Sequence, residues 1–194
     1  MSGAEGRFLT GSTMGHVVRM TATGAFGITF VFIVDAANLF WLAQLGDRQL
    51  IAAIGFAYAI QFFSVSSGIG LMIAGTALVA RAIGEGRRDL AREHAGASMA
   101  ISVLIQGLMA SLIFVFRQDL IAMSGAVGET AALAERYLAM TIFSLIPMAI
   151  SMLLSGTLRA DGYGAKAMYV TLFSGVVLMV VDPILIIWMG LGLD

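Results

Sequence analysis

Two carboxylates stand inside long apolar segments of this chain, Asp35 and Asp182. Hydrocarbon strongly disfavours an ionised group, so acids in such segments are rare and typically line an ion or proton path. Each acid follows a basic residue by sixteen positions, Arg19 before Asp35 and Lys166 before Asp182. At about 1.5 Å rise per residue, each acid lies roughly 24 Å along its helix from a cationic anchor. The pattern predicts a coupling-ion site whose two carboxylates lie at a similar depth.

The neighbours of both acids allow a functional and a structural interpretation. Pro183 removes a backbone donor directly after Asp182, so the helix is expected to kink or open beside that carboxyl. Asn38 lies three residues after Asp35 and shares roughly the same helix face. The structural alternative is a bent helix with Asp182 paired to a neighbour, and an Asp35 that completes an interhelical hydrogen bond. We favour ion binding, with a protonatable Asp35, because pairing alone leaves the cost of ionisation in lipid.

The composition indicates an integral membrane protein. Hydrophobic residues make up 59% of the chain and charged residues 12%, against about 25% charged residues in a soluble domain. The net charge of −1 and the absence of cysteine give no support to a nucleic-acid partner, a disulfide framework or a thiolate metal site. We expect no metal and no cofactor. We also expect no enzyme, because no nucleophile–base pair lies within the apolar segments.

The apolar segments that hold these residues are long enough to span a bilayer, which takes about 20 residues per helix. We therefore predict an all-α, polytopic membrane helical bundle. The five predicted spans cover approximately residues 20–45, 50–83, 97–116, 131–158 and 167–189.

Basic residues orient the predicted spans. The N-terminal side and the second and fourth loops carry eight Lys and Arg residues, and the opposite side carries three. Lys and Arg mark the cytoplasmic face, so we expect a cytoplasmic N-terminus and place Asp194 on the outer side of the plasma (inner) membrane. Residues 190–194 resemble a turn that leads into another element. We therefore expect a fragment of a longer protein.

Other residues in the spans favour packing over chemistry, with two exceptions. Gly68, Gly70 and Gly75 of the second span, with nearby serines, are typical of close helix contacts. Gln61 is a buried amide that could line a cavity or form an interhelical hydrogen bond. Tyr137 lies within the fourth span at a depth comparable to that of the acids.

Several stretches, in this order and spacing, resemble the multidrug and toxic compound extrusion (MATE) family. They run over nearly the whole chain and are Val34-Asp35, Leu45-Gly46, residues 50–55, residues 81–88, Tyr137-Leu138, residues 158–162, residues 181–183 and residues 190–192. The resemblance implies twelve spans in two six-helix lobes around a central cavity, so this chain would supply five helices of the N-terminal lobe. The sixth helix and the second, C-terminal lobe are absent from the sequence.

The resemblance also implies an activity and a set of site residues. Members of the family export organic, often cationic, compounds in exchange for protons or sodium. Asp35 and Asp182 fall on the acids of the proposed coupling site, and Tyr137 falls on a tyrosine of the same pocket. Asn38, Ser155 and Gln61 complete our candidates for the cavity lining.

Three departures from the family pattern bear on the ion and on the mechanism. Leu178 and Ser155 stand where some members carry asparagine, and the loss of two amide ligands favours protons over sodium. The first helix reads Thr23-Gly24-Ala25-Phe26-Gly27 where members often carry a proline, so glycines would have to supply any hinge.

We therefore interpret the chain as most of the N-terminal lobe of a proton-coupled antiporter for organic cations. Two alternatives stay open. One is a non-transporting or oligomeric membrane protein, or an inactive remnant, in which the acids are structural. The other is a flippase of the same superfamily for a lipid-linked sugar. The sequence leaves the substrate, the oligomeric state and the choice between proton and sodium open.

Overall fold

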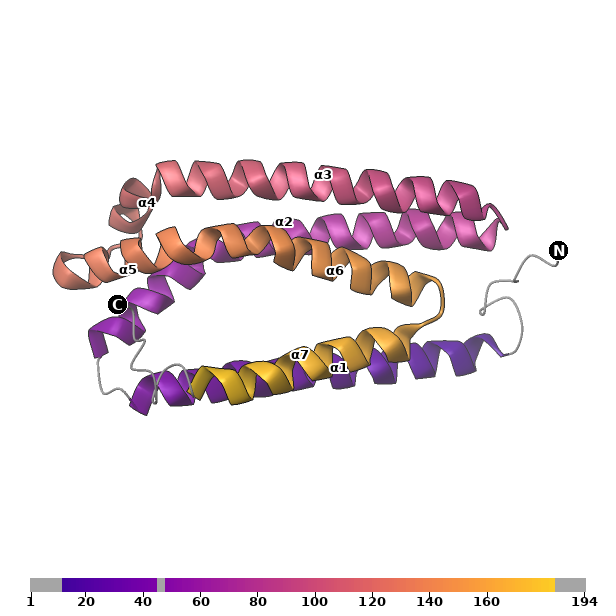
Figure 1. Ribbon diagram of the computed structural model, residues 1–194, viewed down its shortest axis with the longest axis horizontal. Helices are drawn as coiled ribbons and strands as arrows, with labels where there is room; N and C mark the ends of the chain where they lie inside the picture. Colours follow the sequence, from indigo (N-terminus) through magenta and orange to yellow (C-terminus); the bar gives the residue numbers. More distant parts are fainter. Residues whose placement is uncertain (1–11, 45–47, 184–194) are drawn as a thin grey trace.

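The computed structural model describes residues 12–44 and 48–183, and only the backbone of residues 42–44, 182 and 183 (Figure 1). Every regular element in that part of the chain is helical, as the sequence predicted. The elements are α1 (Thr13–Gln44), α2 (Arg48–Gly84), α3 (Arg88–Val115), α4 (Arg117–Met123), α5 (Gly128–Thr141), the 3-10 turn η1 (Ile142–Ser144), α6 (Leu145–Ala160) and α7 (Gly164–Pro183).

Five stretches of the described chain are long and apolar enough to cross a membrane, in agreement with the predicted fold class. Four are the single helices α1, α2, α3 and α7, and the fifth is formed by α5, η1 and α6 together. The first and third helices begin earlier than the predicted spans, at Thr13 and Arg88. Their polar first turns lie outside the apolar windows on which the prediction rested. Residues 184–189 of the fifth predicted span lie outside the described residues.

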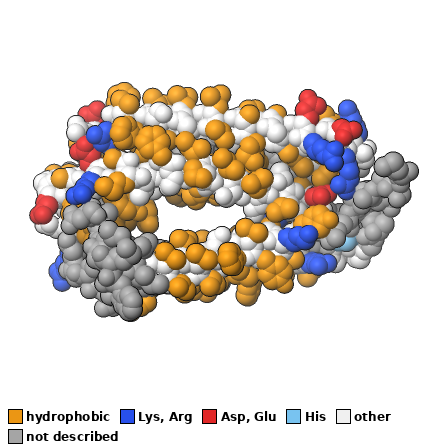
Figure 2. Space-filling model, in the orientation of Figure 1, with side chains coloured by type: hydrophobic (Ala, Val, Ile, Leu, Met, Phe, Trp, Pro, Cys, Tyr) orange, Lys and Arg blue, Asp and Glu red, His pale blue; other side chains and the backbone are white. Residues whose placement is uncertain are grey.

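The helices form two layers. Helices α1 and α7 lie side by side and run in the same direction in one layer, and α2, α3, α5 and α6 pack together in the other (Figure 1). Hydrophobic side chains cover the middle of the molecule, and charged side chains gather at its two ends (Figure 2). This distribution is the one that a bilayer requires, because charges are costly in the hydrocarbon and favourable at the interfaces.

Turns at one end of the bundle are closed by glycines that accept a left-handed backbone. Gly86 has φ of +73° and Gly162 has φ of +84°. In each turn the next backbone N–H reaches five residues back, from Arg87 to the Ala82 carbonyl at 2.9 Å and from Tyr163 to the Leu158 carbonyl at 2.8 Å. These bonds satisfy carbonyls that the helix ends would leave free. The α2–α3 and α6–α7 connections therefore have the same backbone hydrogen-bond pattern.

The fourth predicted span is interrupted by η1, which the prediction of one helix over residues 131–158 missed. Pro147 explains the break, because a proline nitrogen cannot donate to the carbonyl four residues earlier. Side-chain hydroxyls bond nearby carbonyls instead: Ser144 Oγ donates to Thr141 O at 2.6 Å, and Thr141 Oγ1 donates to Tyr137 O at 2.9 Å.

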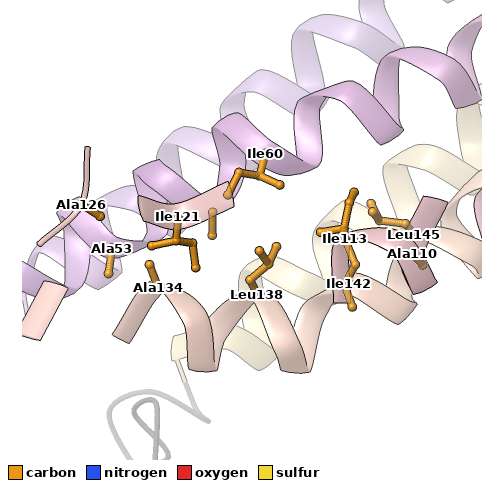
Figure 3. Packing of buried hydrophobic residues seen from close by; sticks show 11 residues of the cluster. Ala53, Ile60, Ala110, Ile113, Ile121, Ala126, Ala134, Leu138, Ile142 and Leu145 are labelled. Atoms are coloured by element: carbon orange, nitrogen blue, oxygen red, sulfur yellow. The ribbon is translucent and has the colours of Figure 1, made fainter. Parts of the chain in front are cut away.

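The largest cluster of buried apolar residues lies where α2, α3, α4, α5, η1 and α6 meet (Figure 3). Ile121 of the short helix α4 is 2% exposed and closes this end of the cluster. Leu138 and Ile142 carry the cluster across the junction of α5 and η1. The interruption of the fourth span is therefore part of the packed core.

Glycines set the spacing of α2, α3 and α6. A Cβ on Gly68 would stand 2.8 Å from Gln106 Nε2, and one on Gly75 would stand 2.8 Å from Leu153 Cδ1. The packing interpretation is confirmed for these two residues and is wrong for Gly70, where the space around the backbone is open. Gly156 of α6 is the tightest case, because a Cβ there would collide with the Thr76 hydroxyl of α2. Small residues thus allow the close helix approach that is typical of membrane bundles.

We expect Gly156→Val to destabilise the bundle and Gly70→Val to have little effect. Both changes add the same side chain to a helix, but only the first forces α6 away from α2. Overpacking of this kind costs about 1–3 kcal/mol. Thermal unfolding of the two variants in detergent, followed by size-exclusion chromatography, measures the difference. Equal loss of folded protein in both variants would contradict the proposed contact.

Candidate functional site

An opening separates the α1–α7 layer from the layer that contains α2 and α6, and the space-filling view shows it in the middle of the molecule (Figure 2). Helix α1 packs mainly on α7, whereas α2 packs on α3, α5 and α6. The turn between α6 and α7 joins the two layers at one end of the molecule (Figure 1). Of the predicted site residues, Asp35 and Asn38 are on α1 in one layer, and Gln61 and Tyr137 are on α2 and α5 in the other.

Asp35 lies on the side of α1 that faces the other layer. Gly24 of α1 is in contact with the Arg159 side chain of α6, which marks that side of the helix. Asp35 follows Gly24 by eleven residues, or three helical turns, so the two positions share one stripe. The residue is exposed, and its carboxylate forms no ion pair with any side chain that the structure describes. Asp35 is thus an unpaired acid at the opening.

Asn38 lies on the edge of the same stripe, nearer to α7. It follows Gly27 by eleven residues, and Gly27 is touched by both Arg159 of α6 and Met168 of α7. The Oδ1 atom of Asn38 is buried and has no hydrogen-bond partner. An unsatisfied buried acceptor is costly, so a hydrogen-bond donor, such as a protonated carboxyl, would be favourable beside the Asn38 oxygen.

The register of α1 against α7 corrects the predicted equal depth of the two acids. A Cβ on Gly164 would stand 3.5 Å from Thr23 Oγ1, and one on Gly175 would stand 2.9 Å from Val34 Cγ2. From either contact, Asp182 is six residues further along α7 than Asp35 is along α1. At 1.5 Å per residue this offset is roughly 9 Å.

The prediction of equal depth failed because it assumed that the two cationic anchors, Arg19 and Lys166, lie at the same depth. In the observed register, Lys166 also lies six residues further along than Arg19. Asp182 follows Gly175 by seven residues, about two turns, so its position belongs to the α1-facing stripe of α7. It is level with residue 41 of α1, three residues beyond Asn38. The nearest predicted partner in register is therefore Asn38 and not Asp35.

Gln61 and Tyr137 meet in a polar group on the opposite wall. Gln61 Nε2 donates to Thr141 Oγ1 at 2.6 Å, and Thr141 Oγ1 donates to the Tyr137 carbonyl at 2.9 Å. The Tyr137 ring packs edge-on against Tyr58 with ring centroids 6.2 Å apart. Residues of α2 and α5 thus join two predicted site residues into one group.

Tyr58 and Thr141 are members of this group that the sequence interpretation missed. Tyr58 precedes Gln61 by three residues and Thr141 follows Tyr137 by four, so each shares a helix face with a predicted residue. That spacing was the available signal. Ser155 is half-buried on α6 and stands apart from the group. The structure therefore brings together two of the six predicted residues and distributes the others over α1, α6 and α7.

A separate polar contact lies inside the packed layer. Gln106 of α3 donates to the Ser64 carbonyl at 2.9 Å and to Ser67 Oγ at 3.2 Å, and accepts from Ser64 Oγ at 2.6 Å. A pocket of about 10 Å³ beside it is lined in part by Gly68 and Met148. Sites for drug-sized ligands have volumes of roughly 300–1,000 Å³, so this pocket is too small for one. Gln106 holds α2 and α3 together.

The described residues contain no group of three or more His, Asp or Glu side chains that could hold a metal ion. The two layers beside the opening carry the unpaired, exposed carboxylate of Asp35 and the buried, unpartnered amide oxygen of Asn38 on α1, and the Tyr58 and Tyr137 rings on α2 and α5. This arrangement can bind a proton or a monovalent cation on one wall and stack an organic ring on the other.

Comparison with known proteins shows the family of the chain. The family model described as MatE matches residues 24–184. The chain belongs to the MatE family. Among its MatE relatives, the probable multidrug resistance protein NorM of Agrobacterium fabrum is 30% identical over 141 residues, which are 72% of this chain and 30% of that protein. A FAD transporter of Shewanella oneidensis is 22% identical over 183 residues, which are 94% of this chain and 40% of that protein.

A solved MatE structure has the same fold. The outward-facing conformation of a multidrug resistance MATE family transporter superposes with a TM-score of 0.90 at 22% identity. The match covers 98% of this chain and 42% of that one. This MatE chain thus spans less than half the length of the relatives that it matches.

We expect Gln106→Leu to cost more stability than Gln61→Leu in this MatE chain. The first change removes three hydrogen bonds in a buried position and the second removes one, at about 0.6 kcal/mol each in a membrane protein. The expected losses are about 2 and about 0.6 kcal/mol. Unfolding of both variants in mixed micelles measures them. If Gln61→Leu were the more destabilising change, the α2–α5 group and not the α2–α3 contact would hold the layer together.

Proposed function

We propose that this chain forms part of a membrane exporter that exchanges organic compounds for protons. The observation that carries the proposal is Asp35, an unpaired acid on the α1 stripe that faces the opening. Acids in membrane-spanning segments typically line ion or proton paths, and a carboxyl can bind and release a proton. Family membership supports transport as the activity.

Asn38 and Asp182 extend the proposed proton site along α1 and α7. The unpartnered Asn38 oxygen can accept a hydrogen bond from a protonated carboxyl. Position 182 belongs to the α1-facing stripe of α7 and is level with residue 41 of α1, three residues beyond Asn38. Protonation at this level would strengthen the α1–α7 contact, and loss of the proton would leave the acceptor unsatisfied again. A proton can shift the packing only by this difference in affinity between two states.

Protons are favoured over sodium by the side chains near the acids. A sodium site needs several oxygen ligands, and Leu178 supplies none where an amide would stand. Ser155 contributes a single hydroxyl on α6. The proposal includes a cytoplasmic N-terminus, a second lobe that completes the cavity and a plasma-membrane location. It is a transporter and not an enzyme.

For the substrate we propose an organic cation with an aromatic ring. The polar group on α2 and α5 presents the Tyr58 and Tyr137 rings and the Gln61 amide. Aromatic rings attract organic cations and stack on flat ligands. The relatives named for multidrug resistance support this class of cargo, and the relative named as a FAD transporter provides the competing candidate.

We predict that Asp35→Asn abolishes proton-coupled export by the complete protein. An amide keeps the size of the side chain but does not bind and release a proton. Proteoliposomes that contain a pH-sensitive dye and ethidium as the substrate measure exchange, which should fall to the level of empty vesicles. Asp119→Asn is the matched control, because Asp119 is an exposed acid on α4 outside the opening. Full exchange by the Asp35→Asn protein would refute the assignment.

A second prediction separates the ions and the cargo. Ethidium export should follow an imposed pH gradient without sodium and should not respond to a sodium gradient at constant pH. FAD should compete weakly. Export driven by sodium alone would move the coupling role to a cation site, and strong competition by FAD would replace organic cations as the cargo.

A further inference from the structure

A guanidinium without a carboxylate partner lies at one end of the opening. Arg159 belongs to the last turn of α6, and its side chain crosses to α1. Its Nη1 atom lies 3.3 Å from the point where a Cβ on Gly24 would stand, and its Nη2 atom lies 4.0 Å from the same point on Gly27. The two glycines leave bare helix backbone against which the guanidinium lies. Arg159 therefore turns inward between the layers, although water is available beyond the turn that follows.

Other arginines at this end of the bundle are paired differently. Four of them contact a carboxylate: Arg81 to Glu85 at 2.9 Å, Arg88 to Asp161 at 3.5 Å, Arg92 to Asp89 at 3.6 Å and Arg87 to Glu85 at 3.8 Å. Asp161 is the acid nearest to Arg159 in sequence, and its carboxylate contacts Arg88 instead. Within the described residues, Arg159 has neither an ion pair nor a hydrogen bond. Among the described residues, the arginines of the α2–α3 turn are paired with carboxylates, and Arg159 at the junction of α1, α6 and α7 is not.

Arg19 and Lys166 are two further cations at this end of the α1–α7 layer. Thr23 Oγ1 donates to the Arg19 carbonyl at 3.0 Å and lies 3.5 Å from the Cβ point of Gly164. The α1 turn that carries Arg19 is therefore beside the start of α7, where Lys166 follows two residues later. Lys166 Nζ lies 4.5 Å from the centroid of the Tyr163 ring. Basic side chains are visible at this end of the α1–α7 layer, next to the opening (Figure 2).

We propose that Arg159, together with Arg19 and Lys166, binds the phosphate group of an anionic phospholipid. A guanidinium presents a planar fork of donors that matches two phosphate oxygens, and the two other cations add charge. The basic end of a membrane protein lies on the cytoplasmic side, where anionic lipids are concentrated. The apolar walls of the opening provide surface for the acyl chains.

Orientation of the protein in the membrane does not by itself explain this arrangement. A cation that only marks the cytoplasmic side is most stable when it extends into water, as the long side chain of arginine allows. Arg159 is half-buried against two glycines and is directed toward the apolar part of α1. An unpaired guanidinium is costly there, and a phosphate removes that cost. The inference does not depend on the transport activity proposed above.

Native mass spectrometry of the purified chain in detergent, titrated with phosphatidylglycerol or phosphatidylcholine, tests the proposal. We expect preferential binding of phosphatidylglycerol. Arg159→Gln should weaken it about tenfold, equivalent to 1.4 kcal/mol. Arg92→Gln is the matched control, since it removes the same charge from the same end at a side chain that is 82% exposed. The control should bind phosphatidylglycerol as the unchanged protein does.

Two more variants keep the test decisive if Arg159→Gln does not fold. Arg159→Lys retains the charge without the two-point contact and should show an intermediate affinity. Arg19→Gln changes an exposed residue and should weaken binding about twofold to threefold. Equal affinity for the two lipids, or equal effects of Arg159→Gln and Arg92→Gln, would overturn the proposal. Displacement of phosphatidylglycerol by inorganic phosphate at equal concentration would assign the same site to a soluble phosphate and overturn the lipid as its ligand.

Discussion

The interior of a lipid bilayer offers no hydrogen-bond partner, and this constraint shapes the whole chain. Backbone groups are satisfied within helices, the glycine turns satisfy carbonyls at helix ends, and the Ser144 hydroxyl donates to the Thr141 carbonyl where η1 interrupts the helix. Gln106 bonds with Ser64 and Ser67 for the same reason, because a buried amide in α3 would otherwise be unpaired. Each polar contact inside the α2–α3–α6 layer therefore also determines where two helices touch.

The same constraint distinguishes the two layers. Glycines and buried polar bonds lock α2, α3 and α6 at close range, so this layer has the character of a rigid support. Helices α1 and α7 pack on each other through Gly175, and α1 carries the buried, unpartnered Asn38 oxygen and receives the Arg159 side chain of α6 at Gly24. Unsatisfied groups concentrate at functional sites in proteins that otherwise avoid them. The proposed proton site therefore belongs to the α1–α7 layer, and the proposed cargo group belongs to α2 and α5.

Much of the fold could be predicted from the sequence, because local properties determine it. Long apolar segments separated by glycine-rich polar turns define the spans, and small residues such as Gly68 and Gly75 mark helix contacts. The register of α1 against α7 could not be predicted, since it depends on packing between helices far apart in the chain. The equal spacing of Arg19–Asp35 and Lys166–Asp182 is real, but the two intervals are offset by six residues. In the sequence, Arg159 was one of the basic residues that oriented the spans. Its contact with α1 depends on how α6 packs, which the sequence does not show.

The side-by-side pairing of α1 and α7 has a consequence for how the protein is made. These helices are the first and the last of the described chain, and about 120 residues separate the end of one from the start of the other. At about 5–20 residues per second, on the order of 10 s passes before α7 exists. During that time α1, which carries Asp35 and the side-chain-free backbone at Gly24 and Gly27, lacks its packing partner α7. It must then be covered by lipid or by the insertion machinery. Among the described helices, the α1–α7 contact is therefore the last to form.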